Sequence, residues 1–354
     1  MSTRVDLFLG DSKEKLKRLP SNSVDLIVTS PPYADQRKGT YGGIRPDKYV
    51  EWFLPISKEL LRVLKPTGTF VLNIKEKVVE GERSTYVMEL IIEMRKQGWL
   101  WTEEFIWHKK NCYPGKWPNR FRDAWERLLQ FNKARTFNMY QDEVMVPMGD
   151  WAKSRLKNLS DTDKTRDNSK VGSGFGKNIS NWLTRDKAYP SNVLHLATEC
   201  SNKSHSAAFP EELPEWFIKL FTREGDTVLD PFMGSGTSVV VANRMRRRAV
   251  GVDLMPEYFK IVRDQLNVPI TATGTELHLN DGGVMHTPPP NEILPAVVAN
   301  VAAARDRVPI IIEPVAVGKK PAKAKKAVAS KKSKLTTTKQ KTSKTKPTAN
   351  AVRS

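Results

Sequence analysis

The chain has 354 residues and a formal net charge of +19, and it is long enough for one large domain with extensions or for two smaller ones. No apolar run approaches the roughly 20 residues that span a bilayer, and the first residues lack the pattern of a secretory signal, so a cytoplasmic location is expected. The two cysteines, Cys112 and Cys200, are in neither CxxC nor zinc spacing. The sequence therefore supports neither a disulfide framework nor a metal site.

The positive charge is concentrated at the C-terminal end. Residues 319–354 hold twelve Lys and one Arg without an acidic residue, which leaves +6 for residues 1–318. Lys, Ala, Thr, Ser and Pro cannot bury a core, so this tail is expected to be disordered. Its charge favours nonspecific attraction to the phosphates of nucleic acid, with a solubilising tail or another polyanion as the alternative.

In chain order, strand and helix patterns alternate through the first 130 residues. Strands are predicted at 4–10, 23–30, 65–74, 101–109 and 126–133, and helices at 12–19, 47–64 and 85–99. Ser12 is expected to cap the first helix. Alternation of this kind predicts an α/β sheet with helices on both faces.

The pattern changes twice further along the chain. From roughly 135 to 190 it is polar and Gly-rich, and it is too long for an ordinary connection, so it is either functional or disordered. Order returns at 212–254 as a helix, a strand that ends near Asp230, a Gly-rich turn, a helix and another strand, which together form one βαβ unit. Residues 268–318, rich in Pro, Ala and Val, have no clear period, and their fold stays open.

The stretch TSPPY at 29–33 ends the second strand abruptly. Neither proline has an N–H to donate, so the strand must stop at about Ser30. The stiff loop then presents Ser30 and Tyr33 at the carboxyl end of a strand, where open α/β sheets bind ligands. Taken alone, these residues are equally compatible with a rigid turn.

A second informative stretch is TVLDPFMGSGTS at 227–238. Its glycines let backbone N–H groups and a helix N-terminus approach a polar ligand closely. It lacks the Lys of a P-loop and the third Gly of a dinucleotide fingerprint. Asp253 ends the next strand, where its carboxylate can accept hydrogen bonds from ribose hydroxyls. These features predict a nucleoside-containing ligand that is not a triphosphate, with a Gly-rich turn and a solvent-facing Asp as the alternative.

Taken together, SPPY and DPFMGSGT resemble the amino-group DNA methyltransferases that use S-adenosylmethionine, in the permuted order with the catalytic motif before the cofactor loop. The resemblance covers about residues 4–267. It implies a Rossmann-like S-adenosylmethionine-dependent methyltransferase fold with a mixed, mostly parallel sheet. The predicted parts are a catalytic domain at 1–134 and 191–267, a target-recognition insert at 135–190, a Pro/Ala-rich extension at 268–318 and the disordered tail at 319–354.

The resemblance also assigns roles to residues. Ser30 and the carbonyl of Pro31 would accept hydrogen bonds from the amine of a flipped-out base, Pro32 would stiffen the loop, and Tyr33 would stack on the base. The implied cofactor residues are Asp11 at the adenine, Gly234, Ser235, Gly236 and Thr237 around the methionine part, Asp253 at the ribose, and Phe209, Asp230 and Phe232 completing the pocket. For Asp11, helix capping is the alternative.

Aromatic and basic residues interleave between 105 and 123, as on a nucleic-acid surface. The residues expected to contact DNA are Lys109, Lys110, Arg120 and Arg122. Trp107 in the same stretch is compatible with a base platform and with an ordinary core position. The Gly-containing segment 33–43 is expected to be mobile and to close over the flipped base, although an ordinary surface loop has the same composition.

Serine at the head of the motif usually accompanies cytosine N4 in the resembling family, whereas an acidic or amide residue usually accompanies adenine N6. The resemblance thus implies a site-specific cytosine-N4 methyltransferase of duplex DNA, of restriction-modification type. A cognate restriction endonuclease, a monomeric or weakly dimeric state and association with DNA in the cytoplasm are further expectations. Open alternatives are methylation of adenine or RNA, a DNA-binding protein with an idle methyltransferase domain, and a nicotinamide oxidoreductase, which the incomplete fingerprint disfavours.

Overall fold

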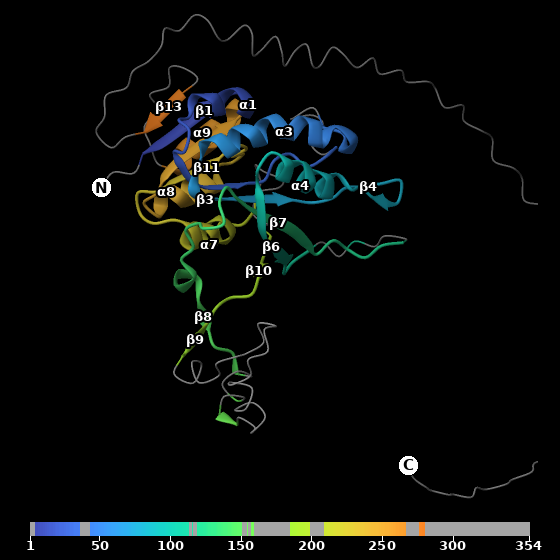
Figure 1. The fold of residues 1–354 in the computed structure, drawn as a ribbon, viewed down its shortest axis with the longest axis vertical. Helices are drawn as coiled ribbons and strands as arrows, with labels where there is room; N and C mark the ends of the chain where they lie inside the picture. The colour runs from blue at the N-terminus through green and yellow to red at the C-terminus, as the bar shows by residue number, and fades with distance from the viewer. Residues whose placement is uncertain are drawn as a thin grey trace, which may run out of the picture. The chain divides into compact units, whose positions relative to one another are not determined.

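The computed structural model describes residues 4–35, 43–112, 115, 119–150, 154, 157–158, 185–198, 209–266 and 276–279 (Figure 1). The strands of its main sheet are β1 (Val5–Leu9), β2 (Val24–Thr29), β3 (Leu64–Ile74), β6 (Leu100–Lys109), β7 (Trp125–Asn132), β10 (Val193–Leu196), β11 (Thr227–Asp230), β12 (Arg248–Asp253) and β13 (Glu276–Leu279). Its helices are α1 (Ser12–Lys15), α3 (Pro46–Val63), α4 (Tyr86–Lys96), α7 (Glu212–Phe221), α8 (Thr237–Arg244) and α9 (Pro256–Gln265). Short elements are the 3-10 turns η1 (Leu16–Arg18) and η2 (Gln141–Val144). Two small antiparallel sheets pair β4 (Val78–Val79) with β5 (Glu82–Arg83) and β8 (Val146–Pro147) with β9 (Lys187–Ala188).

Within the described residues, the main sheet has the strand order β10-β6-β7-β3-β2-β11-β12-β1-β13. Strands β3, β2, β11, β12 and β1 are mutually parallel, whereas β7 and β13 run antiparallel to their neighbours. The late βαβ unit β11-α8-β12 therefore lies between β1 and β2, which are adjacent in the chain. This order brings the carboxyl ends of β2 and β11 side by side at the point where the strand order switches, which is the ligand-binding edge of open α/β sheets.

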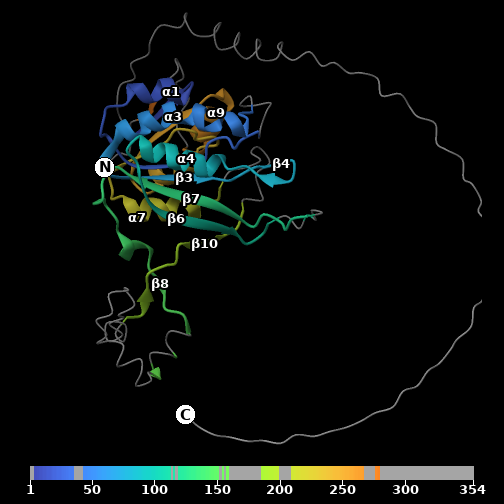
Figure 2. The same cartoon turned by 45° about the vertical axis from the view of Figure 1, so that its right-hand side comes forward.

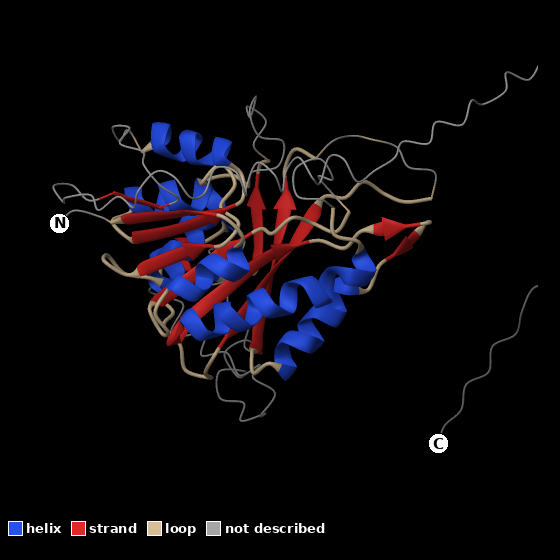
Figure 3. Cartoon of the chain, turned by 90° about the horizontal axis from the view of Figure 1, so that it is seen from above, coloured by secondary structure: helices blue, strands red, loops and turns tan. Residues whose placement is uncertain are grey.

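Helices cover both faces of the sheet. Figures 1 and 2 show α3 and α4 on one side and α7 on the other, and Figure 3 shows the twisted strands from above. Helix α3 buries Tyr49, Phe53, Ile56, Leu60 and Val63, which recur every three or four residues along one face. All six residues of β2 are buried, as expected for a strand covered on both faces. The predicted mixed α/β fold is confirmed.

One local prediction is wrong. Asp11, and not Ser12, caps α1: its side chain accepts a hydrogen bond of 2.8 Å from the backbone N–H of Lys13. The buried hydroxyl of Ser12 instead donates to the carbonyl oxygen of Pro231 in the Gly-rich turn. The first helix is also shorter than predicted, because it passes into the 3-10 turn η1 at Leu16.

The described part of segment 135–190 is anchored on the catalytic domain. Val144 and Met148 are buried, Tyr140 N–H donates to the carbonyl of Leu220 in α7 at 2.6 Å, and Glu143 pairs with an arginine that follows α7. Most of the rest of the predicted recognition insert lies outside the described residues, as do the tail 319–354 and, except for β13, the extension 268–318. In the part of the chain that is described, no helix is long and apolar enough to cross a membrane.

Candidate active site

The SPPY loop begins directly at the carboxyl end of β2. Ser30 and Tyr33 are partly buried there, and Pro31 is buried. Just beyond them, Asp35 pairs with Lys77 at 2.7 Å, which holds the start of the following segment. The predicted mobile segment 33–43 lies outside the described residues from 36 to 42.

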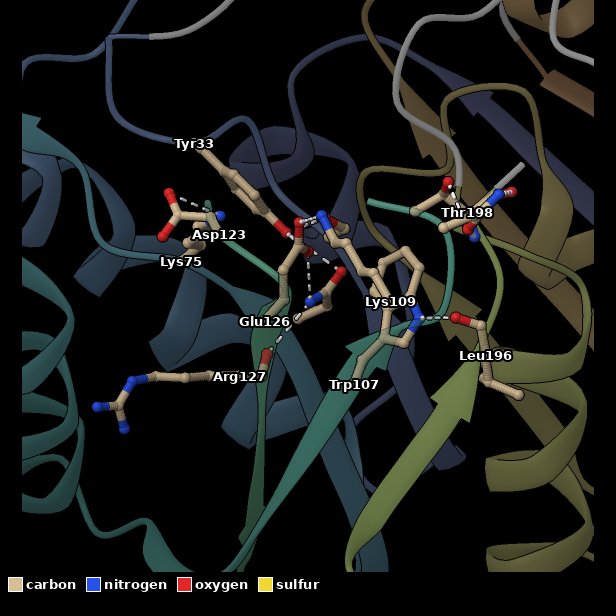
Figure 4. Close-up of polar contacts among 12 residues, drawn as sticks. Tyr33, Lys75, Trp107, Lys109, Asp123, Glu126, Arg127, Leu196 and Thr198 are labelled. Carbon is tan, nitrogen blue, oxygen red and sulfur yellow. Dashed lines mark hydrogen bonds and ion pairs between the residues drawn. The ribbon is translucent and has the colours of Figure 1, made fainter. Parts of the chain in front are cut away.

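The hydroxyl group of Tyr33 is held by three side chains. It lies 2.6 Å from Glu126 Oε2, 3.2 Å from Asn73 Oδ1 and 3.3 Å from Ser30 Oγ (Figure 4). Glu126 also pairs with Lys109 Nζ at 2.5 Å. Burial, together with the charge and hydrogen bond of Glu126, raises the pKa of Tyr33 well above its usual value, so the phenol stays protonated at neutral pH.

Asp230 joins the SPPY loop to the Gly-rich turn. Its buried carboxylate accepts hydrogen bonds from Thr29 Oγ1 at 2.6 Å, from the Phe232 N–H at 3.0 Å and from the hydroxyl of Ser238 in α8. Since Thr29 is the residue before Ser30, one carboxylate fixes the two predicted motifs relative to each other. Thr29 and Asp230 are about two hundred residues apart in the sequence.

The environment of Asp230 predicts a pH effect on stability. Burial raises the pKa of its carboxyl to about 6 from 3.8, against the lowering effect of its three hydrogen bonds. The native state therefore holds this proton more tightly, and the free energy of unfolding contributed by Asp230 falls as the pH rises from 3.8 to about 6. In urea denaturation at several pH values, the difference between wild type and Asp230→Asn should change by about 1.4 kcal/mol per pKa unit across this window. A difference that is constant with pH would contradict the assignment.

Asp253, at the end of β12, supports the Gly-rich turn from the other side. Its Oδ2 accepts from the Gly234 N–H and its Oδ1 from the Met255 N–H, both at 2.9 Å. Gly236 precedes α8 in the left-handed conformation, and the helix has no side-chain cap. Its N-terminal N–H groups therefore suit a polar ligand, and the Asp253 carboxylate lies beside the same turn.

Two glycines of the turn predict different outcomes on substitution. A Cβ on Gly236 (φ +80°) would lie 2.2 Å from Val262 Cγ2 of α9, whereas one on Gly234 (φ +52°) would meet nothing within 4 Å. We expect Gly236→Ala to add a clash of about 1–3 kcal/mol to a backbone cost of about 1–2 kcal/mol, and Gly234→Ala to cost the backbone term alone. Chemical denaturation measures both losses of stability.

Calorimetric titration of S-adenosylmethionine should show weaker binding to Gly234→Ala than to the wild type. Wild-type affinity in Gly234→Ala would remove the turn from the cofactor site.

A cavity of about 450 Å³ lies beside Asp11, between the start of α1 and α3, and is also lined by Trp52 and Ile56. Phe232 packs against Trp52, with ring centroids 5.7 Å apart. Asp11 thus caps a helix, as the alternative for this residue proposed, and it also lines a cavity with an apolar wall. Its contact with adenine stays a prediction. The cavity, the open space at Gly234 and the carboxylate of Asp253 fit the parts of an adenosine-containing cofactor. Phe209 is buried in the core cluster that contains α7.

The residues predicted to contact DNA differ in their surroundings. Lys110 and Arg122 are exposed and Arg120 is partly exposed, near the tip of the β6–β7 hairpin. Lys109 is mostly buried through its pairing with Glu126, and its ammonium lies 5.0 Å from the Trp107 ring centroid. Trp107 is only 4% exposed and donates to the carbonyl of Leu196 in β10, which supports the core reading for this residue.

Sequence reasoning missed three groups of this site. Asn73 and Glu126 sit in strands that read as ordinary alternating segments, and Trp52 reads as one more apolar residue of α3. For Asn73 and Glu126, the sequence signal is a polar side chain inside a predicted strand, which is costly to bury without a partner. Trp52 has no such signal. Within the described residues, no cluster of three His, Cys, Asp or Glu could hold a metal ion.

Fold and site together define an S-adenosylmethionine-dependent methyltransferase. The family model described as DNA methylase (N6_N4_Mtase) matches residues 24–264. The chain belongs to this DNA methylase family, and S-adenosylmethionine is accordingly its methyl donor.

Individual relatives agree with this membership. The chain is 33% identical over 275 residues to the Type II methyltransferase M.PvuII of Proteus hauseri, covering 71% of this chain and 80% of that protein. It is 27% identical over 296 residues to the Type II methyltransferase M.XycI of Xanthomonas campestris pv. cyanopsidis, covering 73% and 87%. The solved structure of PvuII DNA methyltransferase (cytosine-N4-specific) superposes with a TM-score of 0.57 at 27% identity, over 78% of this chain and 90% of that one.

Proposed function

We propose that this chain methylates the exocyclic N4 amine of cytosine at a specific site in duplex DNA. The observation that carries the proposal is the junction of the two motifs, where Thr29 at the head of the SPPY loop donates to Asp230 at the head of the Gly-rich turn at 2.6 Å. A base at Ser30 and a cofactor at Gly234 would therefore be neighbours. The similarity to a structure whose name specifies cytosine N4, and the serine at the head of the motif, support cytosine over adenine.

The chemistry requires an activated amine held in place. The lone pair of an exocyclic amine is delocalised into the base, and the amine is out of reach within the stack, so the base must flip out. Ser30 Oγ and the carbonyl of Pro31 would accept the two amine hydrogens, which localises the lone pair on nitrogen, and Pro32 keeps the loop rigid. Tyr33 would stack on the base. Most of the rate gain would come from positioning, which can supply effective molarities of about 10⁵ M or more.

The cofactor side would be held by the opposite loops. Gly234, Ser235, Gly236 and Thr237 would wrap the methionine part, Asp253 the ribose, and Asp11 with Phe232 the adenine, while Asp230 fixes the two loops. When bound, S-adenosylmethionine supplies an electrophilic methyl group on its sulfonium. Ser30 is neutral and a weak base, so the amine proton would leave after methyl transfer.

Duplex docking would use the β6–β7 hairpin. Arg120 and Arg122 flank Phe121, whose side chain is 96% exposed on the β6–β7 hairpin. Basic side chains on this hairpin would contact phosphates, and residues 135–190 would supply sequence recognition. Since the similar proteins are named Type II methyltransferases, a cognate restriction endonuclease that reads the same site is part of the proposal.

The salt dependence of binding tests this docking face. Arg120→Ala with Arg122→Ala should weaken DNA binding about equally on all sequences and should lower the slope of log K against log salt by about 2. Deletion of 319–354 should also lower that slope while leaving methyl transfer measurable at low salt. Fluorescence anisotropy from 50 to 300 mM salt measures the slope. An unchanged slope in both variants would remove these residues from the DNA interface.

Transfer of a labelled methyl group tests the activity. The purified chain and S-adenosylmethionine are incubated with duplex DNA of diverse sequence and, in parallel, with RNA. Label in the duplex supports the proposal. Label only in RNA, or no label in either nucleic acid, would contradict it.

A further inference from the structure

Two strands place a side chain at the phenol oxygen of Tyr33, and a third strand supports them. β3 contributes Asn73 and β7 contributes Glu126, while Lys109 of β6 pairs with Glu126. In Figure 4 the side chains of Tyr33 and Glu126 point toward each other. Antiparallel pairing sets this meeting, because Asn73 lies opposite Leu128 and Trp107 opposite Glu126. Glu126 is 7% exposed and Asn73 is 2% exposed, so the cluster is shielded from water.

The hydroxyl proton of Tyr33 faces two acceptors, Glu126 Oε2 at 2.6 Å and Asn73 Oδ1 at 3.2 Å. Neither oxygen can donate, and the shorter contact is with the charged carboxylate, so the phenol proton of Tyr33 is donated chiefly to Glu126. The phenol oxygen can then only accept from Ser30, whose Oγ lies 3.3 Å away. Ser30 has one proton, and this contact uses it. The lone pairs of Ser30 Oγ are thereby left to accept a hydrogen bond from another group.

We propose that Glu126 is a positioning residue that acts through Tyr33 to hold Ser30 as a hydrogen-bond acceptor toward the target amine. This inference rests on the proposed function, since it requires that Ser30 meets that amine. Without Glu126, the Tyr33 hydroxyl keeps only the longer contact with Asn73 Oδ1 at 3.2 Å, so it could turn its proton toward Ser30, and Ser30 could then point its own proton at the amine. A donor facing a donor cannot polarise the amine.

The remaining contacts of Glu126 fix its orientation. Lys109 occupies Oε1 at 2.5 Å, and Asn73 Nδ2 donates to Oε2 at 3.1 Å, which leaves Oε2 facing the phenol. Asn73 Nδ2 is itself held by the carbonyl of Arg127 at 3.2 Å. An ion pair between Glu126 and Lys109 alone would use one oxygen, and the second oxygen is the one aimed at the SPPY loop. Both oxygens of Glu126 are therefore required for the arrangement.

The test is a double-mutant cycle with Glu126→Gln and Tyr33→Phe. The amide of Gln cannot accept from both Tyr33 and Lys109, and Phe keeps the stacking ring while losing the hydroxyl. Each single variant should lower kcat about 10- to 100-fold, with an unchanged dissociation constant for S-adenosylmethionine. The double variant should be no slower than Tyr33→Phe. Glu76→Gln is the matched control, because Glu76 is a buried carboxylate that pairs with Arg127 and not with Tyr33.

Multiplicative losses in the double variant, or wild-type kcat in Glu126→Gln, would overturn the inference. A second readout needs no turnover: the ¹³C signal of the Tyr33 ζ carbon, assigned with Tyr33→Phe, should shift in Glu126→Gln and stay in place in Glu76→Gln. An unmoved signal in Glu126→Gln overturns the positioning role by itself. Absence of methyl transfer by the wild type overturns the proposed function instead, so the two failures are distinguishable.

Discussion

Replacing Ser30 by alanine is expected to lower kcat by about 10²–10³-fold, the usual loss when one preorganised hydrogen-bonding group at a reacting centre is removed. The binding of S-adenosylmethionine should be unchanged, because the hydroxyl of Ser30 donates to Tyr33 and not to the Gly-rich turn. Single-turnover methyl transfer and calorimetric titration of the cofactor measure the two quantities.

The matched control for this variant is Ser23→Ala. Ser23 lies just before the other end of β2, where its hydroxyl donates to the carbonyl of Pro20 at 2.7 Å. Its loss should leave kcat unchanged. A Ser30→Ala rate equal to that of the control would remove Ser30 from the mechanism.

Replacing Asp253 by alanine is expected to weaken S-adenosylmethionine about 10- to 100-fold, since hydrogen bonds to a charged group contribute about 1.5–3 kcal/mol. The substitution also releases the N–H groups of Gly234 and Met255, so the Gly-rich turn should lose its fixed position. At saturating cofactor, kcat should recover most of its wild-type value, and the methylated sequence should stay the same.

Asp226→Ala is the control for that experiment. Asp226 Oδ2 accepts from the Arg223 N–H at 2.7 Å in the turn before β11, at the opposite end of that strand from the site. Its replacement should cost stability without changing the affinity for the cofactor. If both variants bind S-adenosylmethionine equally well, Asp253 does not hold the ribose.

The sequence predicts the sheet well where its strands are covered on both faces. Apolar runs such as 24–29 and 227–230 lie between turn residues, and each became a buried strand. The insertion of β11 and β12 between β1 and β2 has no signal in periodicity, because strand order depends on contacts between segments two hundred residues apart. The resemblance to permuted DNA methyltransferases implied the order of the motifs along the chain, whereas the position of β11 and β12 in the sheet comes from the structure.

Elements with weak or conflicting signals were missed. β10 (Val193–Leu196) has four residues and is recognisable only through its pairing with β6. α9 begins at Pro256, a favoured first position of a helix, but its polar composition hides the buried pair Phe259 and Val262. β13 falls in the region whose fold the sequence left open, and it forms by pairing with β1.

The residues of the candidate site also fall into two groups, those that a local sequence pattern indicates and those that only the structure brings together. The glycines, prolines and terminal aspartates form local patterns, so they could be found from sequence. Glu126 and Asn73 could not, because their meeting with Tyr33 depends on the register of three strands. Lys109 is a further example. Its basic side chain predicted a contact with DNA, and the structure shows that it pairs with Glu126.

The most direct test of the central claim is mass spectrometry of nucleosides from duplex DNA of diverse sequence after incubation with the chain and S-adenosylmethionine. We expect 4-methylcytosine in the wild-type reaction and about 10²–10³-fold less of it at the same early time point with Ser30→Ala. 6-Methyladenine would keep the enzyme class but contradict the choice of cytosine. The absence of any methylated base would contradict the proposed function as a whole.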